Sequence, residues 1–242
     1  ASTTICSGSA LNLSVTATGS GTLSYQWMNG ATNVGTNSNS FSVSSAATTD
    51  AGTYKVVVSS TSVCPSATSS NAVVNVTPAA TITTQPSSST VCQGSTLSFT
   101  IATTNADSIG WFLGTTKVGT GSTYSKTNAQ AADSGNYVAI VYRGAGCTDV
   151  SSNSVLGAVI KAPVITTQPT ASSFGCNGSN FTSLSVVASN ATAYQWKQGS
   201  TNKGGTAATI SINPFSVSDT GNYTVVVSGA TPCADVTSTI AN

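Results

Sequence analysis

Apolar residues in this chain fall in short runs in which every second residue is apolar, and polar segments rich in glycine, serine and asparagine separate the runs. The most regular runs are 11–15, 25–27, 41–43, 54–58, 74–76, 97–101, 137–141, 184–186, 194–196, 210–212 and 223–227. A period of two is typical of strands that bury one face. Because no segment shows a sustained apolar stripe of helical period, we predict an all-β chain with essentially no helix beyond a turn.

The same sequence pattern occurs three times along the chain. A pentapeptide Asp-x-Gly-x-Tyr recurs, with its defining residues at Asp50, Gly52, Tyr54, Asp133, Gly135, Tyr137, Asp219, Gly221 and Tyr223. The copies follow Trp27, Trp111 and Trp196 by 23, 22 and 23 residues, and these tryptophans are 84 and 85 residues apart. We therefore predict three domains of about 80 residues, at 1–78, 79–161 and 162–242, with a tryptophan in each core.

Proline marks the predicted boundaries. The segments 77–80 and 161–163 each lead into an identical Ile-Thr-Thr-Gln-Pro, at 82–86 and 165–169. Because proline lacks an amide donor, we expect an edge strand that kinks there, and linkers this short favour domains stacked as a stiff rod. The first domain lacks this strand, and the third ends before the apolar strand that 73–76 supplies in the first. We expect either further flanking repeats or a neighbouring molecule that donates the missing strands.

An Asp-x-Gly-x-Tyr motif downstream of a tryptophan resembles the corner of immunoglobulin-like sandwiches, where a tyrosine hydroxyl bonds back to upstream backbone. The resemblance implies three tandem immunoglobulin-like β-sandwich domains in an elongated, end-to-end array. A Cys-x-Gly, a Tyr-Gln-Trp strand and a late cysteine extend the likeness. Together these motifs resemble the tandem Ig-like repeats of secreted cell-surface and adhesin-type proteins of Bacteroidetes, although the second repeat has Ile109-Gly110-Trp111 instead of Tyr-Gln-Trp.

Each repeat has two cysteines at corresponding positions. One lies in what we call the Cys-x-Gly turn, which begins at Cys6, Cys92 or Cys176, and the other in the late-cysteine loop, which carries Cys64, Cys147 or Cys233. Six cysteines without histidine or a Cys-x-x-Cys motif favour disulfides in an oxidising compartment over zinc. Aliphatic residues occupy the places of the usual immunoglobulin disulfide, so we expect aliphatic packing around the tryptophan.

Two pairing schemes are open. Sequence proximity predicts a bridge within each repeat: Cys6 with Cys64, Cys92 with Cys147 and Cys176 with Cys233. Strand alternation in tandem sandwiches instead puts the two cysteines of a repeat at opposite poles, about 20 Å apart, whereas a disulfide tolerates about 7 Å between Cα atoms. This staggered scheme, which we favour, pairs Cys6 with Cys147 and Cys92 with Cys233. It directs Cys64 and Cys176 to neighbouring repeats or subunits.

Charged residues make up 5% of the chain, the net charge is +1, and histidine is absent. The chain therefore offers no basic surface for nucleic acid and few groups for acid-base chemistry. Asp133-Ser134-Gly135 and Asp219-Thr220-Gly221 match the aspartic protease motif, but each lies in a separate predicted domain, so no carboxylate dyad can form. We predict that the chain is not an enzyme, binds no metal or cofactor, and does not insert into a membrane.

A few residues are candidates for carbohydrate chemistry. Tyr25 and Tyr194, each two residues before a tryptophan, would suit a sugar-stacking platform, although their period favours core packing. Asp107-Ser108-Ile109 resembles an O-glycosylation signal of Bacteroidetes envelope proteins, which makes Ser108 a candidate site. Asn-x-Ser/Thr sequons also occur, but a chain this rich in these residues contains them by chance. They are at Asn12, Asn75, Asn177, Asn180, Asn190 and Asn222.

The resemblance implies an extracellular cell-surface protein with a structural or adhesive role, in which the repeats form a rigid stalk or the body of a fibre. Its partners would be neighbouring Ig-like repeats, other copies of the chain, or surface glycans and other cells. The alternative is a carbohydrate-binding accessory module of a secreted enzyme.

Overall fold

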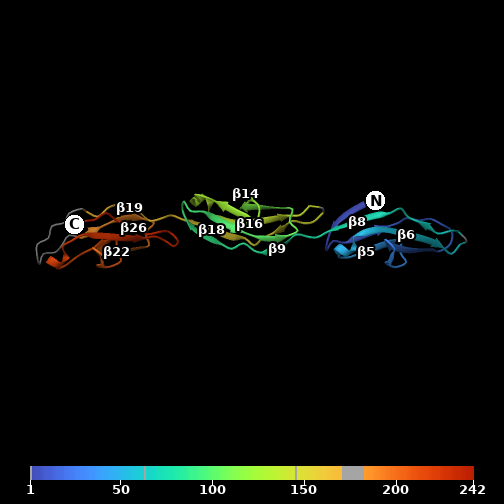
Figure 1. Cartoon of the computed structure of the whole chain (residues 1–242), viewed down its shortest axis with the longest axis horizontal. Helices are drawn as coiled ribbons and strands as arrows, with labels where there is room; N and C mark the ends of the chain where they lie inside the picture. Colours follow the sequence, from blue (N-terminus) through green and yellow to red (C-terminus); the bar gives the residue numbers. More distant parts are fainter. Residues whose placement is uncertain (1, 63, 145, 171–182) are drawn as a thin grey trace. The chain divides into compact units, whose positions relative to one another are not determined.

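The computed structural model describes residues 2–62, 64–144, 146–170 and 183–242. Within these residues the secondary structure consists of β-strands and three short 3-10 turns (Figure 1). The turns are η1 (Thr48–Asp50), η2 (Ala131–Asp133) and η3 (Val217–Asp219), and each leads into an Asp-x-Gly-x-Tyr corner. The all-β prediction, with a turn at each corner, is confirmed.

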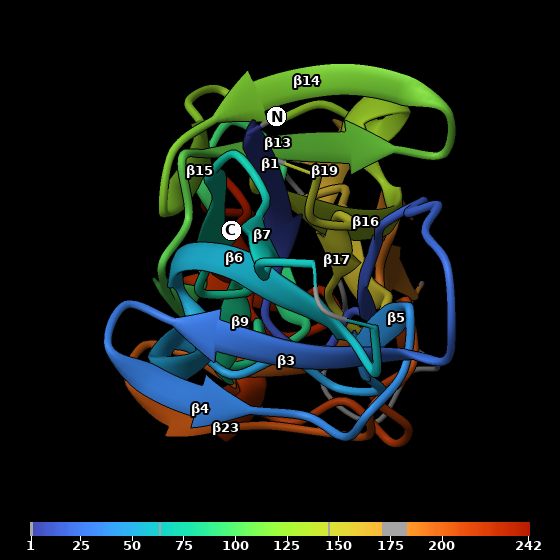
Figure 2. The ribbon, with the colours of Figure 1, turned by 90° about the vertical axis from the view of Figure 1, so that its right-hand side faces the viewer.

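The first repeat contains a large sheet and a two-stranded sheet. The large sheet has the order β1 (Ser2–Cys6), β8 (Ala72–Thr77), β6 (Gly52–Ser60), β3 (Leu23–Asn29) and β4 (Thr32–Val34), with β7 (Ala67–Thr68) also on β6. The small sheet pairs β2 (Leu11–Ser14) with β5 (Ser40–Val43). Figure 1 shows β6 and β8 side by side, and Figure 2 shows β3 beside β4.

The second repeat has the same order of strands. Its large sheet runs β10 (Ser89–Cys92), β18 (Val155–Ile160), β16 (Gly135–Tyr142), β13 (Ser108–Leu113) and β14 (Thr116–Thr120), with β17 (Val150–Ser151) also on β16. Its small sheets pair β11 (Leu97–Thr100) with β15 (Thr123–Lys126) and β9 (Thr81–Thr84) with β12 (Ala102–Thr104). The recurrence of the sheet order follows from the recurrence of the apolar pattern.

The third repeat keeps the central strands of this plan. Its large sheet runs β23 (Thr201–Asn202), β22 (Ala193–Gln198), β25 (Tyr223–Ser228) and β26 (Val236–Thr237). Its small sheets pair β20 (Leu184–Ser185) with β24 (Thr209–Ile210) and β19 (Val164–Thr167) with β21 (Val187–Ser189). An isolated bridge between Tyr223 and Ala241 takes the place that Tyr54 and Ala72 occupy between β6 and β8.

Each repeat is built around its tryptophan. Trp27, Trp111 and Trp196 are all almost fully buried, and each indole nitrogen donates a hydrogen bond to a backbone carbonyl. The bond satisfies the one polar atom of a ring that otherwise packs among apolar side chains. Buried aliphatic residues stand where the usual immunoglobulin disulfide would lie: Val56, Ala139 and Val225.

The segment that leads to the second Cys-x-Gly turn changes partner at Pro86. Strand β9 pairs antiparallel with β12, whereas β10, which follows Pro86, pairs parallel with β18. Strand β1 pairs parallel with β8 in the same way. Proline has no amide hydrogen to donate to a neighbouring strand. It therefore suits the point where the chain leaves one strand partner and joins another. The parallel pairing places Cys6 and Cys92 at the ends of β1 and β10.

The chain divides into two compact units. The first comprises Ala1–Pro86, Thr100–Thr123 and Val138–Asn153, and the second comprises Ser87–Phe99, Tyr124–Tyr137 and Ser154–Asn242. The first repeat lies in the first unit and the third in the second unit, while the second repeat contributes to both. The domain boundaries at 78/79 and 161/162 therefore stay a prediction.

Candidate functional site: corners and cysteine-linked joints

The three Asp-x-Gly-x-Tyr corners use their polar groups in the same local structure. In each, a carboxylate oxygen of the aspartate accepts a hydrogen bond from the backbone amide three residues upstream, at 2.8, 2.8 and 3.0 Å. Each tyrosine hydroxyl donates to the carbonyl of the corner aspartate, at 2.7, 2.6 and 2.7 Å. Burial is the main cause that raises the pKa of all three tyrosines, so the hydroxyls stay protonated donors.

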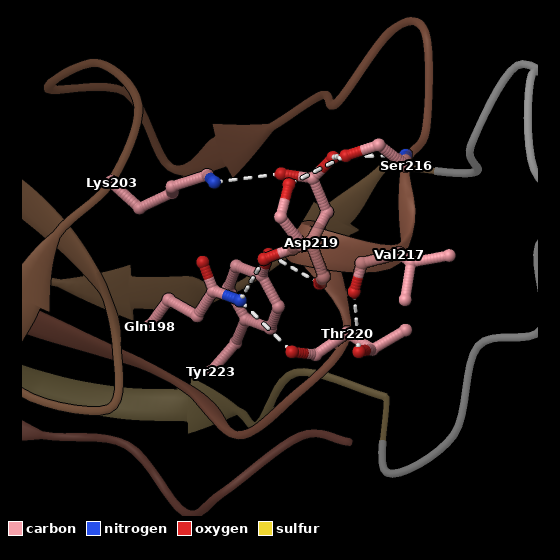
Figure 3. Close-up of polar contacts among 8 residues, drawn as sticks. Gln198, Lys203, Ser216, Val217, Asp219, Thr220 and Tyr223 are labelled. Atoms are coloured by element: carbon pink, nitrogen blue, oxygen red, sulfur yellow. Dashed lines mark hydrogen bonds and ion pairs between the residues drawn. The ribbon is translucent and has the colours of Figure 1, made fainter.

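The third corner holds a denser polar network (Figure 3). Lys203 Nζ lies 2.7 Å from Asp219 Oδ1, and Ser216 Oγ donates to Asp219 Oδ2 at 2.6 Å. Gln198 Nε2 donates to two backbone carbonyls of the same corner. The hydrogen bond from Lys203, followed by those from Ser216, lowers the pKa of Asp219 to about 2. This carboxylate is engaged by a lysine, a serine and backbone, which is the setting of a structural aspartate.

The Cys-x-Gly turns of the first two repeats have the same geometry. The amide of Ser9 donates to Cys6 O at 3.1 Å, and the amide of Ser95 donates to Cys92 O at 3.0 Å. Gly8 has φ of 87° and its equivalent in the second turn has φ of 89°, a region that favours glycine. The glycine of the motif therefore permits the tight turn that presents the cysteine. The third turn, at Cys176, lies outside the described residues.

Two disulfides are present among the described residues, and both join different repeats. Cys6 is bonded to Cys147 with 4.8 Å between Cα atoms, and Cys92 is bonded to Cys233 with 5.0 Å. Both bonds span 141 residues. Each connects the Cys-x-Gly turn of one repeat to the late-cysteine loop of the next, which is the staggered arrangement. Cys64 is an exposed free thiol in the structure.

The first joint lies within the first unit, where side chains of the second repeat hold the linker backbone. Arg143 Nε donates to Pro78 O at 3.2 Å, and Asn105 Nδ2 donates to Ala79 O at 3.1 Å. The hydroxyl of Ser7 accepts a hydrogen bond from the Ala79 amide at 3.0 Å. The backbone polar groups of the linker thus find hydrogen-bond partners in both repeats that the disulfide joins. These bonds fix the path of the linker.

Asp107 supports this joint by holding Arg143 and the backbone beside it. Its carboxylate accepts a hydrogen bond from the Gly144 amide at 2.8 Å and forms an ion pair with Arg143. The backbone hydrogen bond is the largest cause that lowers the pKa of Asp107. Ser108, the candidate for O-glycosylation, is exposed at the start of β13. Modification of Ser108 stays a prediction.

The second joint lies within the second unit and reuses part of this arrangement. Asn190 Nδ2 donates to Ala162 O at 3.0 Å, as Asn105 does to Ala79 O in the first joint. Both asparagines have positive φ, 56° and 57°. Gly229 stands where the first joint has its arginine, and a Cβ on Gly229 would lie 2.6 Å from Pro163 Cδ. A proline ring packed on glycine therefore replaces the arginine contact.

No family model matches the chain, and no curated protein matches it significantly. Among solved structures, the I-band fragment I67–I69 of titin aligns with a TM-score of 0.69 and 16% identity, over 100% of this chain and 94% of that one. Extracellular domains 3–5 of Drosophila OTK align with a TM-score of 0.50 and 15% identity, over 98% and 92%. The chain has the fold of tandem immunoglobulin domains. At these identities the likeness describes fold alone.

The remaining candidate residues of the Ig-like repeats are dispersed. Tyr25 and Tyr194 are half-buried, and Tyr194 packs against the third core. The sequon residue Asn190 is engaged at the second joint, whereas Asn177 and Asn180 lie outside the described residues. In the described ranges, no group of three or more His, Cys, Asp or Glu side chains could hold a metal ion. No helix among these same residues is long and apolar enough to cross a membrane.

Sequence reasoning missed the side chains that hold the linkers. Asn105 and Asn190 each lie six residues before a tryptophan, whereas the first repeat has Gly21 at that place. This recurrence was a usable signal, because asparagine is the residue other than glycine that best tolerates positive φ. The contact between Arg143 and Pro78 had no comparable signal, since a single arginine occurs in the chain.

Proposed function

We propose that this chain is an extracellular structural or adhesive protein whose Ig-like repeats form a stiff stalk or the body of a fibre, within a longer chain or a polymer. It would belong with the tandem-repeat surface proteins of Bacteroidetes that its motifs resemble. The observation that carries the proposal is the pair of disulfides between successive repeats. A protein whose joints are covalently bridged is suited to transmit tension rather than to let its domains swing freely.

Two further features support this role. Disulfides persist in oxidising compartments, which favours a secreted protein. The linkers at 77–80 and 161–163 are short, and their carbonyl groups are bound by side chains of the repeat that follows. Short, well-bound linkers limit the relative motion of successive domains. The partners proposed are neighbouring Ig-like repeats or other copies of the chain.

Small-angle scattering and protease treatment of intact cells test this proposal. A compact protein of this length has a radius of gyration of about 18 Å, and we expect a value well above it for the oxidised chain. Brief protease treatment of intact cells is expected to release peptides of the chain, because the repeats would stand outside the envelope. A compact particle, or peptides released only after lysis, would contradict a surface stalk.

A further inference from the structure

We propose that residues 16–18 of the first repeat bind an extended segment of the pattern Ile-Thr-Thr-Gln-Pro, presented by another Ig-like repeat. The segment pairs with these residues as an added strand, and its glutamine bonds to the backbone of Ser70. Such a surface is a contact between repeats of a stalk or fibre, so the inference rests on the proposed function.

In the second and third repeats, the equivalent place is filled by the repeat's own Ile-Thr-Thr-Gln-Pro segment. Strand β9 pairs antiparallel with β12, and β19 pairs in the same way with β21. In both repeats the glutamine side chain accepts a hydrogen bond from a backbone amide, from Asn153 to Gln85 Oε1 and from Thr239 to Gln168 Oε1, each at 2.9 Å. Two copies therefore define the same mode of binding, a short strand pairing followed by one glutamine contact.

The first repeat has the same framework around residues 16–18. The amide of Val15 donates to Asn39 O at 2.9 Å, and the residues just before β12 and β21 make the equivalent bond at 2.9 and 3.0 Å. Residues 16–18 take the place of β12 and β21 but belong to no strand. Ser70 lies two residues after β7, as Asn153 lies two residues after β17, and it is exposed. The backbone groups that bind the segment in the other repeats are thus accessible in the first.

Two cavities lie on either side of Val15. One, of about 440 Å³, is lined by Ala17, Leu23 and Val58 among others, which suits an aliphatic side chain. The other, of about 330 Å³, is lined by Ser70 among others, which suits the glutamine. None of the residues that line these two cavities is charged. The pair of cavities therefore matches the uncharged sequence Ile-Thr-Thr-Gln-Pro.

The core beside these cavities is less covered than the core of the other repeats. Leu13 and Val15 are half-buried, whereas the residues at their places in the third repeat, Leu184 and Val186, are 2% and 3% exposed. In the third repeat Ile165 of β19 packs against that core. An isoleucine bound beside residues 16–18 removes the equivalent apolar surface from water, which favours binding. Backbone pairing adds affinity, and the two cavities add specificity.

The test uses the purified 242-residue chain and a synthetic peptide with the sequence of residues 80–87. Amide NMR spectra are recorded as the peptide is added to millimolar concentration. We expect saturable shifts at residues 16–18 and at Ser70, whereas the amides of Ala102–Thr104, which β9 already engages, stay unchanged. A peptide with alanine in place of the glutamine is expected to bind about fivefold more weakly, because one hydrogen bond is lost.

A matched pair of variants locates the binding surface. Ala17→Glu places a charge beside the apolar cavity and is expected to weaken binding by about tenfold or more. Thr32→Glu adds the same charge at an exposed position of β4 that lines neither cavity, and it should leave binding unchanged. A dispersed amide spectrum shows that each variant folds. The alanine peptide tests the same surface in the unaltered chain if Ala17→Glu does not fold.

Three results would overturn the inference. These are the absence of saturable shifts at residues 16–18, equal affinity for the native and the alanine peptide, and equal shifts at Ala102–Thr104, which would indicate displacement of β9. An extended surface protein that does not bind the peptide would refute this inference alone. A chain that binds the peptide but that scattering shows to be compact would refute only the stalk.

Discussion

At the scale of single residues, the three corners share one backbone motif and differ in the side chains around it. Asp50 and Asp133 accept backbone hydrogen bonds, and Asp133 also lies 3.5 Å from the exposed ammonium of Lys126. Asp219 is buried and paired with Lys203 at 2.7 Å. An ion pair stabilises the folded state more when its two groups lie closer together and are less exposed to solvent. Acid sensitivity should therefore concentrate at the third corner.

We predict that Lys203→Gln raises the pKa of Asp219 from about 2 toward the ordinary value of 3.8, because the lysine hydrogen bond is the largest cause of the shift. Since the folded-state pKa is depressed, the pair stabilises the native state above about pH 4 and this contribution is lost as the pH falls through 2. Carboxyl-carbon NMR titration measures the midpoint. Lys197→Gln on β22 is the control and should leave it unchanged. Equal midpoints in native protein and Lys203→Gln would refute the assignment.

The tyrosine corner gives a second prediction. Tyr137→Phe keeps the buried ring but removes the hydroxyl that donates to Asp133 O at 2.6 Å. The free energy of unfolding should fall by about 1–2 kcal/mol, since a partly buried acceptor loses its partner. Tyr142→Phe, on the same strand β16 but half-buried, should change it by less than about 0.5 kcal/mol. Urea unfolding followed by tryptophan fluorescence measures both. Equal losses of unfolding free energy in the two variants would mean that the hydrogen bond from Tyr137 to Asp133 does not stabilise the corner.

At the scale of elements, equivalent strands of two repeats carry residues of different size, depending on the side chains that pack against them. Val74 of β8 is buried in the first repeat, and the equivalent position on β18 is Gly157. Phe99 and Tyr137, with ring centroids 4.7 Å apart, fill the space above that glycine. The second repeat therefore exchanges an aliphatic side chain on the strand for larger aromatic contacts.

We predict that Gly157→Val destabilises the chain although valine is the natural residue in the first repeat. A Cβ on Gly157 would lie 2.8 Å from Tyr137 Cε2 and 3.0 Å from Phe99 Cζ, both in ring systems that are themselves packed. Overpacking of this kind costs about 1–3 kcal/mol. Leu156→Val, at the exposed neighbouring position of β18, is the matched control for β-branching. A thermal melt in which Gly157→Val matches the control would show that the core accommodates the side chain.

The strands could be predicted because alternation and turn residues are local signals. The corner could be predicted because Asp, Gly and Tyr each have a defined conformational task within five residues. Strand direction favoured the staggered cysteine pairing over the bridges within each repeat that sequence proximity suggested. The parallel pairing of β1 with β8 could not be predicted, because Ser2–Cys6 shows no alternation and its partner lies some seventy residues away. The ion pair between Lys203 and Asp219 could not be predicted for a similar reason, since that lysine lies in an irregular loop.

At the scale of the whole molecule, the two disulfides overlap in sequence. Cys92 lies inside the loop closed by Cys6 and Cys147, and Cys147 lies inside the loop closed by Cys92 and Cys233. The shortest covalent path from Cys6 to Cys233 runs through both bonds and the 55 residues between Cys92 and Cys147, instead of through 227 residues of backbone. Tension on the termini would therefore bypass most of the chain even if every repeat unfolded.

This connectivity predicts how far the molecule can be stretched. With both disulfides intact, the segment from Cys6 to Cys233 should extend to about 200 Å at most, and after reduction to about 820 Å. Single-molecule force spectroscopy with handles at the two ends measures the difference. Cys6→Ser removes the bond to Cys147 and leaves the bond between Cys92 and Cys233. The shortest covalent route from position 6 to Cys233 then includes the 86 residues from position 6 to Cys92, so the maximum extension rises to about 310 Å.

The native limit alone does not exclude bridges within each repeat, because that scheme leaves a path of nearly the same length. Cys64→Ser separates the two. With the disulfides as the structure has them, Cys64 bears no load and its loss leaves the limit near about 200 Å. If Cys6 were instead bonded to Cys64, the substitution would free the backbone from Cys6 to Cys92, and the limit would rise to about 410 Å. Since the two outcomes differ twofold, one variant decides whether the load passes between repeats or around each of them.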